Sequence, residues 1–112
     1  MLIVDFDPAK DAINQLKHGL PLGLALELDW DVALVWLDER VDYGERRMAA
    51  LVPRDGRIHF VAYVERGDVR RIISLRPANR REVRHYEESN HTDEDPHADR
   101  RRGPPDHGGG PE

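Results

Sequence analysis

The chain has 112 residues, of which 38% are hydrophobic and 35% charged, and it contains no cysteine. This length suits one small domain, and the lack of cysteine excludes a disulfide framework, a thiolate metal site and a thiol nucleophile. The net charge of −5 hides an asymmetry: residues 1–45 carry ten acidic against three basic residues, whereas residues 46–88 carry eleven arginines against six acidic residues. The basic half predicts a phosphate-bearing partner, although fifteen arginines against two lysines also fit the codon bias of a GC-rich genome.

The first residues are apolar, but Asp5 and Asp7 follow at once and no basic stretch precedes them, so a signal peptide is not predicted. The longest apolar run, Val32–Leu37, is far too short to span a membrane. We therefore expect a cytoplasmic protein without a membrane partner.

The N-terminal part predicts a strand at Leu2–Phe6 and two short helices. Asp7 and Pro8 are typical of a helix start, and Gly19 of a helix end, so the first helix is expected to end at Lys17 or His18. Its apolar residues lie on one side at helical spacing and are expected to face the core: Ala9, Ala12, Ile13 and Leu16. A second helix is expected over Pro21–Leu28, with these residues inward: Leu22, Ala25, Leu26 and Leu28.

The middle of the chain predicts four strands joined by hairpins. They are expected at Val32–Leu37, Arg46–Val52, Arg57–Glu65 and Val69–Leu75. Turn signals at Asp55-Gly56 and Gly67-Asp68 separate the last three, so a small antiparallel sheet of about four strands is expected. Trp36 lies in an apolar run and is expected in the core, whereas Trp30 lies in an acidic loop and is a candidate exposed contact for a partner.

The C-terminal part predicts a helix and a tail. Pro77 ends the last strand, Asn79 caps a helix over Arg80–Glu88, and Glu82 lies where it completes a capping box. The expected fold is α+β, with N-terminal helices packed on the sheet and one domain over residues 1–88. Residues 89–112 contain no large apolar residue and are expected to be a disordered polar tail. Its histidines are irregularly spaced, so no metal or other cofactor is expected.

Seven arginines gather in about twenty residues of the basic half: Arg66, Arg70, Arg71, Arg76, Arg80, Arg81 and Arg84. Guanidinium is permanently charged and presents a planar fork that matches phosphate. On a regular strand, Arg70 would share a face with Ser74 and Arg76, while Arg71 would point the other way. These side chains can therefore meet one phosphate only if the strand twists or bulges.

Three blocks of the sequence resemble the BrnT family of bacterial toxins: VDFDPAK followed by KHG, then DERVDYGERR, then YVERGDVRRIISLRPANRREVRHYEE. The resemblance covers roughly residues 3–88. It implies a RelE-like fold, metal-independent RNA cleavage through 2′-hydroxyl attack, and a BrnA-type antitoxin that carries the DNA-binding domain, so that DNA is contacted only indirectly. The chain departs from the family pattern at Val4 and Phe6, where Phe and Trp are usual, and at Pro77, where Lys is usual.

Such cleavage needs a proton acceptor, a proton donor and cations that hold the extra charge on the phosphate. The candidate catalytic residues are Arg66, Arg76, Arg80, Glu82, Tyr86 and His18, and the candidate RNA-binding residues are Lys17, Arg46, Arg70, Arg71 and Ser74. His59 and His85 are further candidates for proton transfer, although His59 alternates with apolar residues and is expected on the surface. The structural alternatives are a capping box for Glu82, a packed helix edge for Tyr86 and a helix cap for His18, so the sequence does not assign the general base.

Two functions fit these observations. One is an endoribonuclease toxin neutralised by its antitoxin, and the other is a non-catalytic relative that binds protein or RNA. A DNA-binding regulator fits less well, because no helix-turn-helix pattern appears. The acidic first half either keeps RNA on the opposite face or meets a basic segment of the antitoxin.

Overall fold

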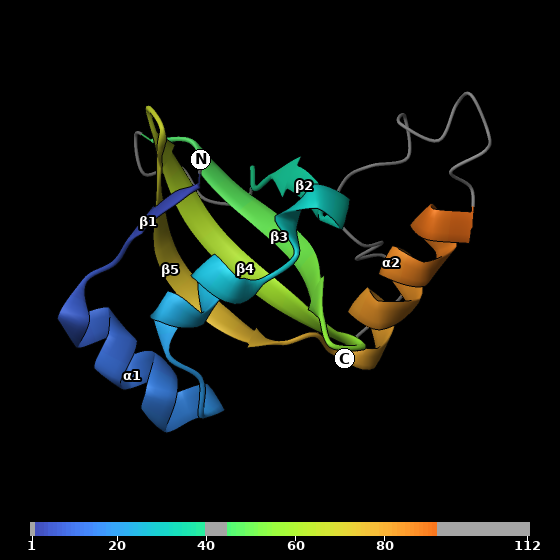
Figure 1. Cartoon of the computed structure of the whole chain (residues 1–112), viewed down its shortest axis with the longest axis horizontal. Helices are drawn as coiled ribbons and strands as arrows, with labels where there is room; N and C mark the ends of the chain where they lie inside the picture. Colours follow the sequence, from blue (N-terminus) through green and yellow to red (C-terminus); the bar gives the residue numbers. More distant parts are fainter. Residues whose placement is uncertain (1, 40–44, 92–112) are drawn as a thin grey trace.

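The computed structural model describes residues 2–39 and 45–91 (Figure 1). Its elements in chain order are β1 Ile3–Asp5, α1 Pro8–His18, the 3-10 helices η1 Leu22–Glu27 and η2 Trp30–Val32, β2 Leu34–Leu37, β3 Arg47–Arg54, β4 Arg57–Arg66, β5 Val69–Pro77 and α2 Arg80–His91. The fold is α+β, as expected. Of the tail expected over residues 89–112, residues 89–91 belong instead to α2, and the rest of it lies outside the described residues.

The sheet has five strands in the order β1-β5-β4-β3-β2. β2 to β5 form an antiparallel meander, and the β3–β4 hairpin turns through Asp55 and Gly56, both with positive φ, as Asp-Gly predicts. β1 pairs with β5 in parallel, with Ile3 opposite Val69. The prediction of a wholly antiparallel sheet of about four strands is therefore wrong. The first strand joins the far end of the meander, a pairing that local sequence does not reveal.

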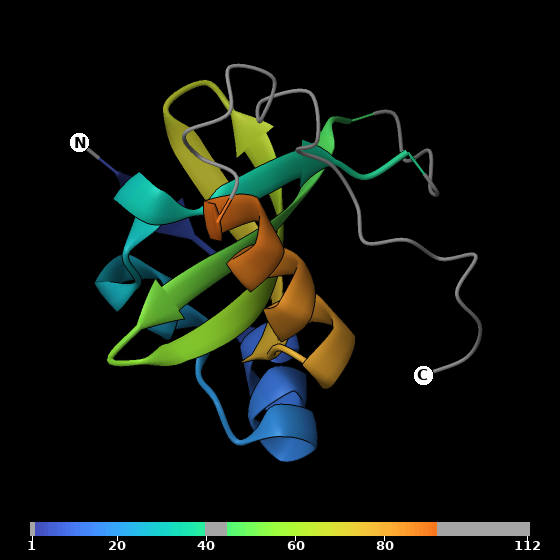
Figure 2. The same cartoon turned by 90° about the vertical axis from the view of Figure 1, so that its right-hand side faces the viewer.

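Both faces of the sheet are covered by other elements. One, the η1 face, carries η1 and η2 and holds the larger core (Figure 1); its fully buried side chains include Leu22, Val52, Val61, Tyr63, Ile72 and Leu75. The other, the α2 face, is crossed by α2 (Figure 2) and holds a smaller core of Leu34, Trp36, Ala49, Leu51 and Tyr86. Trp36 is thus a core residue, as predicted.

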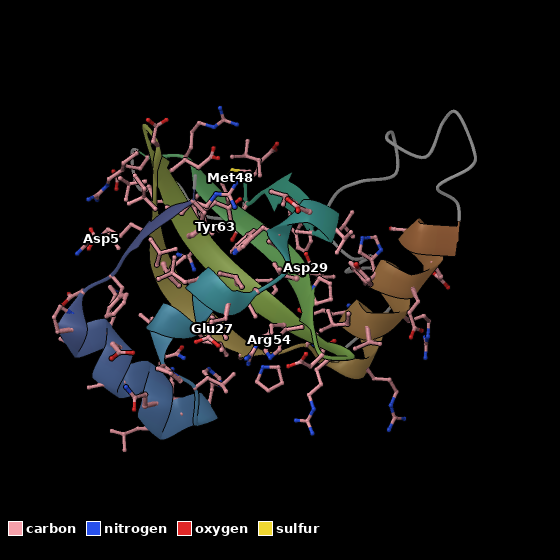
Figure 3. All side chains as sticks on the ribbon, in the orientation of Figure 1. Asp5, Glu27, Asp29, Met48, Arg54 and Tyr63 are labelled. Atoms are coloured by element: carbon pink, nitrogen blue, oxygen red, sulfur yellow. The ribbon has the colours of Figure 1, made fainter. Side chains whose placement is uncertain are left out.

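The second predicted helix forms as the 3-10 helix η1. Leu22, Ala25 and Leu28 are buried, whereas Leu26 is 58% exposed, so its predicted inward position is wrong. A 3-10 helix has three residues per turn, so residues spaced three apart lie on one side of it. Leu22, Ala25 and Leu28 have this spacing and face the core, whereas Leu26 does not. An ion pair of 2.9 Å between Glu27 and Arg54 joins η1 to β3 (Figure 3).

Trp30 is half-buried, so its expected exposed position is wrong, while its contact with a partner stays a prediction. Its indole Nε1 donates to the carbonyl oxygen of Ala25 at 2.8 Å, and its ring packs edge-on against Tyr63. Trp30 is the first residue of the 3-10 helix η2.

The first helix has the predicted ends but the opposite orientation. Asp7 accepts from the backbone N–H of Ala9, and Gly19 closes the helix with φ +72°. The prediction that its apolar side faces the core is wrong: Asn14 is buried, while Ile13 is 53% and Leu16 is 89% exposed. The polar side of α1 therefore packs on the protein.

The last helix begins as predicted. The side chain of Asn79 accepts from the N–H of Glu82, and the Glu82 carboxylate accepts from the N–H of Asn79, which confirms the capping box. The helix continues to His91, three residues beyond its expected end. Along the ranges that the structure describes, no helix is both long and apolar enough to cross a membrane.

Candidate active site

A β-bulge in β5 decides which arginines share a face. Ala62 lies opposite Ser74 and Tyr63 opposite Ile72, so Ile73 is an extra residue between them. The expected alternation is broken there, and Arg71 joins Ser74 and Arg76 on the α2 face. The prediction that Arg70 shares their face is wrong, because Arg70 stays on the η1 face with Ile72 and Leu75.

Arg66 belongs to the same group. It lies two residues beyond Val64, the cross-strand partner of Arg71, and therefore faces the same side of the sheet. We call these four residues, Arg66, Arg71, Ser74 and Arg76, the arginine face. Successive members of one strand face are about 7 Å apart along the strand, so the arginine face is an elongated row rather than a single pocket.

Two members of the arginine face make solvent-exposed ion pairs. Arg66 donates from Nε and Nη2 to the Glu45 carboxylate at 2.8 and 3.1 Å, and Arg71 donates to Asp5. The hydrogen bond from Arg66 lowers the pKa of the Glu45 carboxyl. Exposed pairs of this kind contribute little to stability, and a phosphate group can replace the carboxylate in the guanidinium fork.

Arg76 is held more firmly. Its two terminal nitrogens donate to the two oxygens of Glu82 at 2.8 and 2.9 Å, and its guanidinium carbon lies 4.3 Å from the ring centroid of Phe60. Only 9% of the Glu82 side chain is exposed, and the same carboxylate completes the cap with Asn79. The pair therefore joins β5 to the first turn of α2 and fixes how the helix lies across the sheet.

The predicted proton-transfer residues lie in different surroundings. Both oxygens of Glu82 accept hydrogen bonds, and the Tyr86 hydroxyl donates to the carbonyl oxygen of Val32 at 2.8 Å from a buried position. These contacts match the structural alternatives stated for both residues. His85 packs edge-on against Trp36 in the smaller core.

His59 is 8% exposed, so its predicted surface position is wrong. Burial lowers the pKa of its imidazole below the ordinary value of 6.5. It lies on the η1 face, opposite Val52 and Pro77, and therefore on the other side of the sheet from the arginine face. Pro77 ends β5 in the same row.

The remaining predicted site residues are dispersed. Lys17 and His18 end α1, Arg46 precedes β3 and Arg80 opens α2. In the ranges 2–39 and 45–91, none of these four side chains makes a hydrogen bond or an ion pair. They are available to a ligand, but only Arg80 follows directly on the strand that carries the arginine face.

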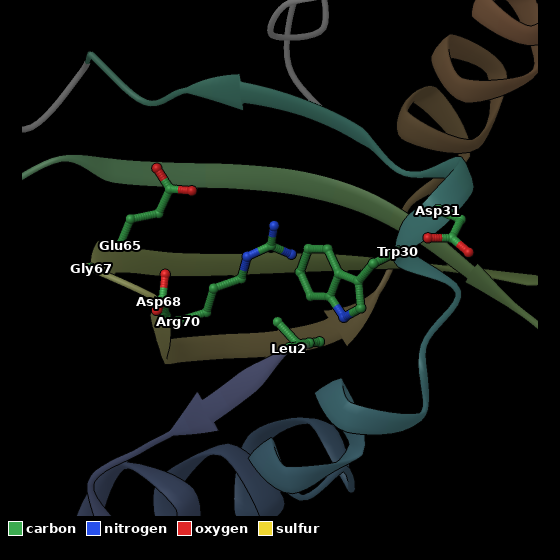
Figure 4. A pocket seen from close by; sticks show the side chains of 7 residues that line it. All are labelled: Leu2, Trp30, Asp31, Glu65, Gly67, Asp68 and Arg70. Atoms are coloured by element: carbon green, nitrogen blue, oxygen red, sulfur yellow. The ribbon is translucent and has the colours of Figure 1, made fainter.

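Arg70 belongs to a separate cleft on the η1 face. Its guanidinium carbon lies 4.6 Å from the ring centroid of Trp30 and 5.2 Å from that of Tyr63. The cleft has a volume of about 420 Å³, and its lining includes Asp31, Glu65 and Asp68. Figure 4 shows Arg70 pointing toward the indole of Trp30, with Asp31 on the far side of the ring. Because three acidic residues and one cation line this cleft, it is a poor site for phosphate.

No local sequence pattern indicates which carboxylates hold the arginine face. Asp5 meets Arg71 through the β1–β5 pairing, and Glu45 meets Arg66 between neighbouring strand ends, both long-range contacts. Arg47 also faces the α2 side, from β3, with its Nε 3.7 Å from Asp38. Among the described residues, no group of three or more His, Asp or Glu side chains is arranged to hold a metal ion.

Comparison with known proteins supports the resemblance seen in the sequence. The family model described as "Ribonuclease toxin, BrnT, of type II toxin-antitoxin system" matches residues 6–82, which include β2 to β5 and the first turn of α2. A comparison with curated proteins finds no match. The matched region defines the chain as the toxin of a type II toxin-antitoxin system, a class in which the antitoxin is a protein. Within that class, the chain belongs to the BrnT family of ribonuclease toxins.

Proposed function

We propose that this chain is a metal-independent endoribonuclease with a RelE-like fold that binds RNA along the arginine face. The observation that carries the proposal is the bulge at Ile73, which brings Arg71 to the same face as Arg66, Ser74 and Arg76. A regular strand would divide these residues between two faces. The bulge interrupts the β4–β5 pairing at the point where it re-aims a charged side chain, as bulges beside functional sites do.

The chemistry assigned to the arginine face is transesterification. The RNA 2′-oxygen attacks the neighbouring phosphorus, its proton passes to a base, the bond from phosphorus to the 5′-oxygen breaks, and that oxygen takes up a proton. Negative charge accumulates on the phosphate oxygens, where guanidinium groups stabilise it. Arg66 and Arg71 would exchange Glu45 and Asp5 for the phosphate, and Arg76 would hold the far end of the row together with Arg80.

Proton transfer is assigned to Glu82, Tyr86 or His18. Glu82 contacts Arg76 directly, and Tyr86 lies one helical turn further along α2. Because Glu82 and Tyr86 already serve as cap and packing residues, catalysis would depend mainly on positioning and on the cations. Lys17 and Arg46 would contribute to RNA binding through charge, whereas Arg70, in the acidic cleft of the η1 face, would not.

The same contacts favour a second candidate, a BrnT relative that binds its partner or RNA without cutting. In that case the ion pairs of Glu82 and the hydrogen bond of Tyr86 are purely structural. Under both readings we propose a BrnA-type antitoxin as partner and a cytoplasmic site of action. DNA would be reached only through the antitoxin.

Expression of the chain in a bacterial host separates the two readings. We expect growth arrest from the wild-type chain and its loss in an Arg66→Ala/Arg71→Ala double variant, whose exposed ion pairs contribute little to folding. Arg57→Ala is the matched control, because Arg57 is exposed at the other end of β4. Arrest that persists in the double variant would exclude the arginine face, and normal growth with folded wild-type protein would favour the non-catalytic reading.

A further inference from the structure

Helix α1 turns its apolar side away from the protein. The residues that pack inward are polar: Asn14 is buried, and Asp11 and His18 are half-buried. The side opposite to them carries Ala9, Ala12, Ile13 and Leu16, all exposed, with Leu16 at 89%. We call these four residues the outer stripe. Single exposed apolar residues are common, but a complete helix side of this kind marks an interaction surface.

The orientation of α1 is fixed by specific hydrogen bonds. The Asn14 amide donates to the carbonyl oxygens of Leu20 and Leu75, both at 2.8 Å, and accepts from the N–H of Leu75 at 3.1 Å. Asp11 accepts from the N–H of Leu22 at 2.8 Å. Rolling the helix to bury the outer stripe would break all four bonds, so the exposure of the stripe is a property of the folded state.

The borders of the outer stripe indicate the chemistry of its partner. Lys10 and Lys17 lie one turn from Ile13 on the same border, and both are exposed. An apolar strip beside two lysines fits an amphipathic segment whose acidic residues lie beside its apolar ones. The C-terminal residues of this chain do not qualify, because residues 89–112 contain no large apolar residue.

We propose that the outer stripe of α1 is a docking surface for the antitoxin, which would supply an apolar helical segment with acidic residues facing Lys10 and Lys17. The proposal rests on the assignment of the chain to a type II toxin family, whose partner is a protein. Self-association fits less well, because a two-fold antiparallel pair of α1 helices would bring the lysine borders of both copies together. RNA fits less well, because the stripe is aliphatic.

This surface is separate from the arginine face. α1 lies beside β5 (Figure 1), and its Asn14 side chain bonds the backbone of Leu75. The arginine face lies on the side of the sheet that α2 covers. An antitoxin anchored on α1 would therefore hold the toxin without itself occupying the phosphate site. Substitutions of Ile13 and Leu16 should therefore affect docking, and substitutions in the arginine face should affect RNA cleavage.

The test uses the full chain and its antitoxin, defined as the protein that restores growth of cells expressing the toxin. Binding is measured by isothermal titration calorimetry for wild type, for Ile13→Glu/Leu16→Glu and for a Leu37→Glu control. Leu37 is 39% exposed on β2, at the opposite edge of the sheet. We expect the α1 variant to bind at least about a hundredfold more weakly, with unchanged growth arrest and thermal unfolding, and the control to bind normally.

Three results would overturn the proposal. The first is unchanged antitoxin binding by the α1 variant. The second is a loss of binding confined to Leu37→Glu, which would place docking at the β2 edge. The third is a wild-type dimer in sedimentation that Leu16→Glu dissociates. If the α1 variant unfolds, Leu16→Gln tests the same surface with a neutral change. Absence of RNA cleavage would count against the proposed function alone, because antitoxin binding is measured independently of cleavage.

Discussion

Replacing Asn14 by alanine tests how the first helix is joined to the sheet. β1 pairs with β5 only as far as Arg71, so beyond that point the outer edge of β5 has no strand partner in the described chain. The Asn14 side chain fills this gap, since its amide donates to the carbonyl oxygen of Leu75 and accepts from the N–H of the same residue. One side chain thus acts as a peptide unit of a neighbouring strand.

The size of the effect follows from the groups that would lose their partners. Asn14→Ala leaves the N–H and C=O of Leu75 and the C=O of Leu20 without these bonds. An unsatisfied buried polar group costs about 1–3 kcal/mol, and the Leu20 carbonyl is only partly buried. We expect a loss of roughly 3–5 kcal/mol, a large part of the roughly 5–15 kcal/mol available to a small domain.

Urea denaturation followed by circular dichroism measures this loss, with Lys10→Ala, exposed on the same helix, as the control. The control should change the free energy of unfolding by less than about 0.5 kcal/mol. Asn14→Asp should be at least as harmful at pH 7, because it keeps the acceptor but aims a carboxylate oxygen at two carbonyls. A loss below about 1 kcal/mol in Asn14→Ala, with an unchanged m-value, would refute the reasoning.

Two further predictions concern buried polar groups. Glu82→Ala should cost about 3 kcal/mol, because it removes the Glu82 half of the capping box and leaves Arg76 unpaired. Glu82→Gln should cost less, and equal melting temperatures for both variants would contradict this. Burial lowers the pKa of His59 in the folded protein. Below about pH 6.5, the unfolded chain therefore binds more protons than the folded one. The stability should fall as the pH falls from that value toward the pKa of the folded state. Unfolding measured at pH 7 and pH 5 should show a smaller decrease for His59→Gln than for wild type, and equal decreases would show that His59 is not responsible.

Local patterns predicted the local structure well. The Asp-Gly hairpin, the caps of α1 and the Asn79–Glu82 box all depend on residues within a few positions of one another, and all three form. Long-range features were not predictable in this way. Helical spacing shows which residues of α1 share a side, but not which side faces the protein, because that is decided by Asn14 meeting Leu75, 61 positions away.

The candidate site was predictable in composition but not in arrangement. The density of arginines indicated a phosphate-binding segment, yet their division between two faces depends on the bulge at Ile73, and neither glycine nor proline marks that position. The carboxylates of Asp5 and Glu45 come from other parts of the chain and could not be paired with Arg71 and Arg66 from the sequence. The sequence therefore predicts a cation-rich surface, and the sheet register determines which cations act together.

The most direct test of the arginine face is cleavage of total RNA by purified, tag-free protein, with and without EDTA. Wild type and Arg57→Ala should cut equally, and cutting should persist in EDTA. The Arg66→Ala/Arg71→Ala variant should be slower by about a hundredfold or more, because two groups that hold phosphate charge are lost. Equal cleavage by the double variant and wild type would contradict the assignment of the site, and cleavage abolished by EDTA would contradict the metal-independent mechanism.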